Sequence, residues 1–216
     1  YACLNIGTPN TNIRSVMQRN ATPEKLTEVT EHNLAALEKM IDYNRKNNIQ
    51  LFRISSDLIP FGSSSVNALP WWDSHAEAFQ HIGAKIQKSS MRVSFHPGQY
   101  TVLNSPDENV VARAILDLAY HAKMLECLGV DNQHKIVLHV GGIYGDKKEA
   151  LQRFELNFRR LPEAVQNRLI IENDDRLYNI EEVLELAHRL QIPAVYDNLH
   201  HAINPPPSRG TDPYWI

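Results

Sequence analysis

Short apolar runs recur along this chain, and several of them end in a side chain that can bind a metal ion. Such runs, rich in apolar and β-branched residues, are typical of buried parallel strands. The pattern predicts strands at 1–5, 50–54, 92–96, 135–139, 168–172 and 193–197. Four of them are written Arg92-Val-Ser-Phe-His96, Lys135-Ile-Val-Leu-His139, Leu169-Ile-Ile-Glu172 and Pro193-Ala-Val-Tyr-Asp197.

Apolar residues at helical spacing separate these runs. Thr22 is a good N-cap before Pro23, and the helix that it opens extends to about Asn47. Further helices are predicted from Asp73 or Ser74, from a capping box at Ser105-Pro-Asp-Glu108, over 147–161, and after the N-cap Asn179 with Glu182 three residues on. Alternating strands and helices favour an α/β fold of the TIM-barrel (β/α)8 type.

The predicted barrel is incomplete. The chain has 216 residues and six β-α units, whereas a complete barrel needs about 250 residues. The chain also opens within the first predicted strand and stops after a proline-rich turn. We therefore expect a single partial barrel domain over 1–216, truncated at both ends.

Metal-ligand side chains end four successive predicted strands. The carboxyl ends of barrel strands meet on one face, so we expect these side chains to gather there. They are His96, His139, Glu172 and Asp197, and His200 and His201 follow closely. Imidazole and carboxylate without thiolate suit Zn²⁺ or Mn²⁺, and clustered ions of this kind hydrolyse phosphate esters. The alternative is that each residue only forms hydrogen bonds across the barrel rim.

The segment His96-Pro-Gly-Gln-Tyr100 adds a feature that a plain metal site does not need. Pro97-Gly98 favours a tight turn that would raise Gln99 and Tyr100 above the barrel mouth. An amide beside an aromatic ring on a rigid projection suits insertion into a stack of bases. The equally simple alternative is a turn whose tyrosine packs back onto the following helix.

Composition constrains the function only weakly. The 22 basic and 25 acidic residues give a net charge of −3, which argues mildly against a nucleic-acid partner. Carboxylates around metal ions are neutralised locally, so the argument is weak. Cys3 and Cys127 are far apart in the sequence, which indicates a reducing cytoplasm, and no stretch has membrane-spanning length.

Five motifs in this order resemble the ultraviolet-damage endonucleases. They are Phe52-Arg-Ile-Ser-Ser-Asp-Leu-Ile-Pro-Phe61, Phe95-His-Pro-Gly-Gln-Tyr100, Leu138-His-Val-Gly-Gly-Ile-Tyr-Gly145, Ile171-Glu-Asn-Asp-Asp175 and Asp197-Asn-Leu-His-His-Ala202. The resemblance implies an incomplete TIM barrel and ATP-independent nicking immediately 5′ of cyclobutane dimers and 6-4 photoproducts. It also implies a divalent cofactor, with Mn²⁺ favoured over Zn²⁺ or Mg²⁺.

The same resemblance assigns roles to particular residues. It implies metal binding by His96, His139, Glu172, Asp197 and His200, of which we expect His96, His139 and Glu172 to be catalytic. It implies that Gln99, Tyr100 and Tyr1, assisted by Asn5, probe the damaged dinucleotide. The expected partner is double-stranded DNA with ultraviolet lesions, bound by a monomer with no membrane attachment.

Two departures from the family pattern keep other functions open. Ser64 stands where a ligand histidine is expected, and the remaining ligands of the family would lie beyond Ile216. A fragment without catalysis that only binds damaged DNA is therefore one alternative. The other is a metal-dependent sugar isomerase or epimerase on the same barrel type, which would use similar ligands without a projecting Gln-Tyr pair.

Overall fold

The computed structural model describes residues 1–207, which belong to two compact units. Unit 1 contains residues 1–97 and 116–136, and unit 2 contains residues 98–115 and those from 137 onward. The five strands follow the order of the sequence in one sheet. The first strand pairs in parallel with the second, the second with the third, and the fourth with the fifth. This α/β architecture confirms the predicted fold class.

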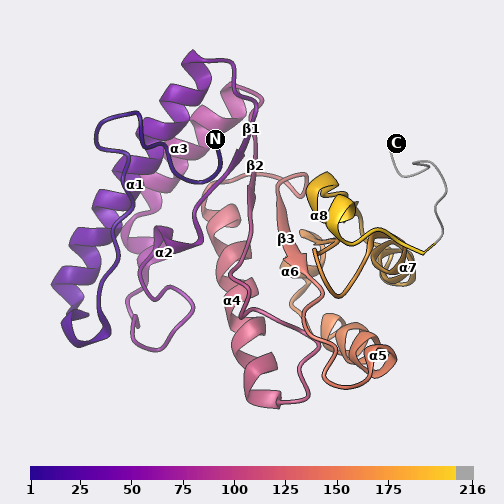
Figure 1. Ribbon diagram of the computed structural model, residues 1–216. Coiled ribbons are helices and arrows are strands. Elements are labelled where there is room, and N and C mark those ends of the chain that lie inside the picture. The colour runs from indigo at the N-terminus through magenta and orange to yellow at the C-terminus, as the bar shows by residue number, and fades with distance from the viewer. Residues whose placement is uncertain (208–216) are drawn as a thin grey trace. The chain divides into compact units, whose positions relative to one another are not determined.

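Unit 1 holds the first part of the sheet and the helices around it (Figure 1). Its elements are 3-10 turns at Gln18–Asn20 and Ser56–Leu58, α1 (Pro23–Lys46), β1 (Leu51–Arg53), α2 (Trp71–Ser74), α3 (Ala76–Lys88), β2 (Arg92–Phe95), the later part of α4 (Glu108–Cys127) and the start of β3 (Lys135–His139). Phe52 pairs with Val93, and Phe95 pairs with Ile136. Strands β1, β2 and β3 are therefore parallel, and their carboxyl ends lie at the same edge of the sheet.

Helix α1 forms where the sequence predicts it. The Thr22 hydroxyl accepts a hydrogen bond from the Lys25 N–H at 3.3 Å, and Pro23 occupies the first turn. The predicted apolar stripe is buried, and it includes Leu26, Val29, Leu34, Leu37 and Ile41. This stripe and the contact between α1 and α3 place the core of unit 1 beneath the two helices, which lie side by side in Figure 1.

Unit 2 continues the same alternation. Its elements are the end of β3, α5 (Lys147–Phe158), α6 (Glu163–Gln166), β4 (Leu169–Glu172), α7 (Ile180–Leu190), β5 (Ala194–Val195) and α8 (Asn198–Ile203). Glu172 pairs with Val195 in parallel register. The predicted capping box forms at the start of α7, where Asn179 and Glu182 satisfy each other's backbone N–H groups. Helix α7 contacts β4 and α5, so the core of unit 2 lies between these elements.

Several predicted elements differ from the structure. Residues 1–5 contain no strand, and the short helix α8 follows Asp197. The helix expected from Asp73 or Ser74 begins at Trp71 and is interrupted at His75. The Trp71 ring is 4% exposed and packs against Phe79 and Tyr120. Burial of this apolar ring stabilises the helix at its earlier start.

The capping box expected at Ser105 is also wrong. The Ser105 hydroxyl accepts from the Asp107 N–H at 3.1 Å, and the Asp107 carboxylate accepts from the Asn109 N–H at 2.8 Å. Asp107 therefore takes the capping role just before α4 begins at Glu108. The prediction of a single domain over 1–216 stays a prediction, and its last residues, 208–216, lie outside the described residues.

Candidate metal centre

Two predicted ligands meet at the ends of neighbouring elements of unit 2. His139 is the last residue of β3 and Glu172 is the last residue of β4. The His139 Nε2 and the Glu172 Oε2 lie 3.3 Å apart, and Glu172 is only 8% exposed. Two ligand atoms that each lie about 2 Å from one ion are separated by about 3 Å. The pair therefore has the spacing expected of two ligands of the same ion.

His200 is oriented by the backbone that follows Glu172. Its Nδ1 lies 2.9 Å from the carbonyl oxygen of Asn173, and its ring centroid lies 5.4 Å from that of His139. Because a carbonyl oxygen can only accept, Nδ1 carries the proton and Nε2 keeps its lone pair. A hydrogen bond of this kind orients metal-binding histidines in many proteins. The structure thus presents His200 in the tautomer that a metal ligand needs.

Asp197 sits between β5 and α8. Its Oδ1 caps α8 by accepting from the His200 N–H at 2.8 Å, while its Oδ2 lies 3.8 Å from the His200 Nδ1. The Asp197 backbone also forms two hydrogen bonds with the side chain of Asn173. His201, the next residue of the doublet, stacks near Tyr196 with ring centroids 5.1 Å apart. Asp197 therefore has a structural role whether or not it binds an ion.

His96 follows β2 and belongs to unit 1. Its Nδ1 lies 3.1 Å from the carbonyl oxygen of Pro97, and this contact orients the ring. Its role as a metal ligand, alongside His139 and Glu172, stays a prediction.

A histidine outside the strand ends has a different environment. His121, on α4, is 1% exposed, and burial lowers its pKa while the nearby Asp117 partly opposes the shift. Its ring packs against Phe95 and Tyr120. It is therefore a neutral core side chain.

The two residues that are predicted to insert into a stack of bases lie at the start of unit 2. Gln99 and Tyr100 are both exposed, and Tyr100 is 74% exposed. The Tyr100 ring lies against Gly98, because a Cβ added at that glycine would be 2.6 Å from the Tyr100 Cε1. A larger residue at position 98 would displace the ring. The turn therefore presents a supported aromatic ring, while its predicted role in lesion probing stays a prediction.

Tyr1 and Asn5 lie together in unit 1. The Tyr1 hydroxyl donates to the Asn44 Oδ1 at 2.6 Å, and its ring centroid lies 5.4 Å from that of Phe52. Burial raises the pKa of Tyr1, and the nearby side chains of Asn5 and Asn44 oppose the shift. The Asn5 Nδ2 is buried and makes no hydrogen bond within residues 1–207. Such a donor is available to an acceptor brought by a ligand.

Ser64, which replaces an expected histidine, uses its hydroxyl locally. The Ser64 Oγ accepts from the Val66 N–H at 3.3 Å within a turn. This bond stabilises the loop rather than extending a side chain toward a ligand.

Two structural residues of this region escape the sequence analysis. Asn173 holds Asp197 and His200, and Asn104 donates to the Gly142 carbonyl at 2.6 Å in the loop after His139. Both asparagines are 0% exposed. Buried amides with distant partners leave no local pattern, so only the folded chain shows their role.

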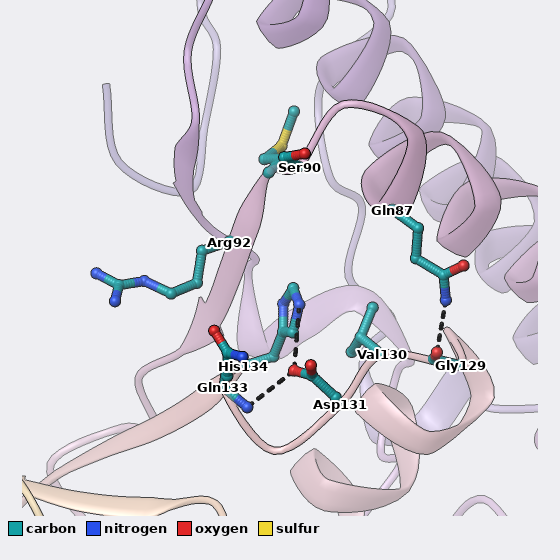
Figure 2. Close-up of a pocket in the computed structure, with 9 residues that line it drawn as sticks. Gln87, Ser90, Arg92, Gly129, Val130, Asp131, Gln133 and His134 are labelled. Atoms are coloured by element: carbon teal, nitrogen blue, oxygen red, sulfur yellow. Dashed lines mark hydrogen bonds and ion pairs between the residues drawn. The ribbon is translucent and has the colours of Figure 1, made fainter.

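A separate hollow lies in unit 1, at the amino-terminal ends of β2 and β3 (Figure 2). It has a volume of about 400 Å³, and the residues lining it are Gln87, Ser90, Met91, Arg92, Gly129, Val130, Asp131, Gln133 and His134. Figure 2 shows Gln87 bonded to the Gly129 carbonyl, and Asp131 bonded to the Gln133 N–H. Its polar groups thus satisfy one another instead of converging on a ligand.

Comparison with known proteins identifies relatives that match most of the chain. Residues 7–213 match the family described as UV-endonuclease UvdE. A UV DNA damage endonuclease of Clostridium perfringens is 42% identical over 201 residues, which cover 93% of this chain and 49% of that protein. One from Bacillus velezensis is 36% identical over 189 residues, with 88% and 59% covered. The chain thus spans about half to three-fifths of the length of these curated relatives.

Solved structures agree with these relatives. The crystal structure of SacUVDE matches with a TM-score of 0.91 and 38% identity, covering 94% of this chain and 70% of that one. A D-psicose 3-epimerase from Clostridium cellulolyticum H10 matches with a TM-score of 0.56 and 16% identity, covering 78% and 60%. The second likeness concerns the fold alone. None of the helices within residues 1–207 combines the length and apolarity needed to cross a bilayer.

Proposed function

Because this chain belongs to the UV DNA damage endonuclease family, we propose that the protein cleaves a phosphodiester bond of DNA beside ultraviolet photoproducts. The observation that carries the proposal is the His139–Glu172 pair, 3.3 Å apart at the ends of β3 and β4. Cleavage immediately 5′ of cyclobutane dimers and 6-4 photoproducts, without ATP, is part of the same proposal.

The residues present fit a divalent cofactor, with Mn²⁺ favoured. His96, His139 and Glu172 would hold it, joined by His200, whose free Nε2 suits a ligand, and by Asp197. A bound ion of this kind polarises a phosphate and makes water a better nucleophile at neutral pH. Two imidazoles and a carboxylate are a donor set that Mn²⁺ and Zn²⁺ both accept.

The protein's own groups supply orientation. The Asn173 carbonyl holds the His200 ring, and the Asn173 side chain holds the turn at Asp197. These bonds fix the imidazole and the carboxylate before substrate arrives, so little reorganisation is needed at the moment of reaction. Glu172, at 8% exposure, is shielded from water, which strengthens its electrostatic interactions.

Recognition of the lesion would fall to exposed side chains near the start of unit 2. We assign the insertion into the weakened stack to Gln99 and Tyr100, with Tyr1 and Asn5 contacting the damaged dinucleotide. The supported ring of Tyr100, 74% exposed, favours this role. A ring replaces the lost stacking, and an amide satisfies the base edges.

The test compares supercoiled plasmid with and without ultraviolet irradiation, incubated with the protein and Mn²⁺ in the absence of ATP. We expect nicking of irradiated plasmid only, and none in EDTA. Glu172→Gln should lower the nicking rate at least a hundredfold, because it removes a charged ligand. The matched control Glu185→Gln changes an exposed carboxylate on α7 and should have no effect.

Two outcomes contradict the proposal. Equal nicking of irradiated and unirradiated plasmid would remove the lesion dependence. Retention of irradiated DNA in a gel shift, without cleavage in Mn²⁺, would instead identify the chain as a damage-binding fragment. Unchanged nicking by Gln99→Ala and Tyr100→Ala would refute the insertion of these two residues into the base stack.

A further inference from the structure

An exposed aromatic ring in the loop between β3 and α5 has no part in the roles given above. Tyr144 is 45% exposed and lies five residues after His139, in the same unit. Its φ is +49°, in the left-handed region that residues with bulky side chains rarely adopt. A strained, exposed ring gains nothing from burial, and such strain is concentrated at functional sites.

The ring is held in one orientation by its neighbours. A Cβ added at Gly142 would lie 3.0 Å from the Tyr144 Cε2, so the ring lies against this backbone. On α5, the Arg153 Cζ lies 5.8 Å from the ring centroid, at the distance of a cation–π contact. The Arg153 Nε donates to the Asn104 carbonyl at 2.9 Å, which fixes the guanidinium in turn. Tyr144 is therefore positioned before any ligand binds.

The loop beneath the ring is anchored as well. The Gly142 carbonyl accepts from the Asn104 Nδ2 at 2.6 Å and from the Tyr178 hydroxyl at 3.1 Å. Asn104 and Tyr178 are both 0% exposed. Two buried donors on a single carbonyl keep the loop from rearranging, so a ligand that meets the ring loses little to ordering the protein.

The segment that follows the ring also carries an exposed cation. Lys148, in the first turn of α5, is exposed and has no ion-pair partner among residues 1–207. Its neighbour Lys147 is instead paired with Glu182 at 2.7 Å. Lys148 follows Tyr144 by four residues. An exposed aromatic ring and an unpaired ammonium group on one short segment suit a base and its phosphate in single-stranded or distorted nucleic acid.

We propose that Tyr144 is a DNA-binding residue that stacks on a base of the distorted strand near the bond that is cut, with Lys148 on an adjacent phosphate. This inference rests on the proposed function. Five residues of chain reach at most about 18 Å, and nucleotides of one strand are spaced about 3.4 Å apart. With about 6 Å added for each of the two side chains, the base that Tyr144 contacts lies within about nine nucleotides of the phosphate held at His139.

The experiment uses Tyr144→Asn, Tyr144→Phe and the control Leu156→Ala. Asparagine tolerates the left-handed conformation, so the first variant removes the ring and keeps the backbone. Leu156 is an apolar side chain of α5 with 65% exposure. Fluorescence anisotropy in EDTA gives the Kd for irradiated and for intact duplexes, thermal unfolding gives the Tm, and nicking of irradiated plasmid is measured with Mn²⁺.

We expect Tyr144→Asn to raise the Kd for the irradiated duplex about tenfold, with less effect on the intact duplex, and to leave the Tm nearly unchanged. Tyr144→Phe and Leu156→Ala should bind like the parent chain. An unchanged Kd would overturn the inference, and so would a tenfold loss for both duplexes or a large fall in Tm. A parent chain that does not nick irradiated plasmid refutes the proposed function instead.

Discussion

The Asn173 side chain forms two hydrogen bonds with the backbone of Asp197. The Asn173 Nδ2 donates to the Asp197 carbonyl at 3.0 Å, and the Asn173 Oδ1 accepts from the Asp197 N–H at 2.8 Å. The carbonyl of Asn173 also accepts from the His200 Nδ1 at 2.9 Å. A single buried residue thus links the ends of β4 and β5 and orients a histidine that is predicted to bind metal.

Asn173→Ala should therefore destabilise the chain and weaken metal binding. It removes two hydrogen bonds and leaves their backbone partners unsatisfied, at a cost of about 2–3 kcal/mol in the free energy of unfolding. Loss of the orienting contact should also lower the affinity for Mn²⁺ about tenfold. Urea unfolding and calorimetric titration measure the two effects. Asn198→Ala, on the exposed start of α8, is the control, and equal results for both variants would contradict this role.

The loop after His139 offers a matched pair of glycines. Gly141 and Gly145 have φ values of +106° and +86°. A Cβ at Gly141 would lie 2.5 Å from the Asn104 Oδ1, whereas one at Gly145 would meet nothing within 4 Å. We expect Gly145→Ala to cost about 1 kcal/mol through backbone strain alone, and Gly141→Ala to cost about 2–3 kcal/mol more through overpacking. Denaturant unfolding measures the free energy of unfolding of both variants. Equal losses for Gly141→Ala and Gly145→Ala would show that Asn104 moves aside freely.

Tyr178 should make stability depend on pH in the alkaline range. Burial raises its pKa from 10.0 to about 12. Because the folded pKa lies above the unfolded one, the neutral phenol contributes its full stability below pH 10 and loses it as the pH rises through 12. Tyr178→Phe, which also removes the bond to the Gly142 carbonyl, should be less stable than the parent chain at pH 8 by about 1 kcal/mol.

The difference in unfolding free energy between the parent chain and Tyr178→Phe should shrink between pH 10 and 12. Urea unfolding at several pH values measures it. Two parallel curves over this range would show that the phenol titrates as it does in the unfolded chain.

Much of the fold and the core of the site follows from local pattern. His139 and Glu172 were predictable because each ends a short apolar run, and parallel strands bring such ends to one edge. The capping box at Asn179 was predictable for the same reason, since its partner Glu182 is three residues away. The signal at Asn179 thus survives folding, whereas the equally local one at Ser105 gives way to a cap by Asp107.

Other features depend on partners that are distant in the sequence. Asn173 bonds to Asp197, which lies 24 positions away. Asn104 and the Tyr178 hydroxyl donate to the same Gly142 carbonyl, although these two residues are 74 positions apart. The strand expected at 1–5 fails because an apolar run forms a strand only if a neighbour pairs with it. Leu4 is 49% exposed and Ile6 is 97% exposed, and no described strand pairs with this segment.

Metal binding should stabilise the folded chain. A ligand at a hundred times its Kd adds about 2.7 kcal/mol to the free energy of unfolding, which corresponds to a rise in Tm of about 5–10 °C for a chain of this size. Mn²⁺ should produce this rise in the parent chain and little of it in Glu172→Gln. Glu185→Gln should respond like the parent, and an equal shift in all three proteins would indicate binding elsewhere.

The central claim is that side chains at the strand ends hold a divalent ion. Crystals grown with Mn²⁺, measured on both sides of the manganese absorption edge, locate the ion directly. We predict an anomalous peak within about 2.3 Å of both the His139 Nε2 and the Glu172 Oε2. A map with no peak beside these two atoms, or with manganese bound only at other sites, would contradict the claim.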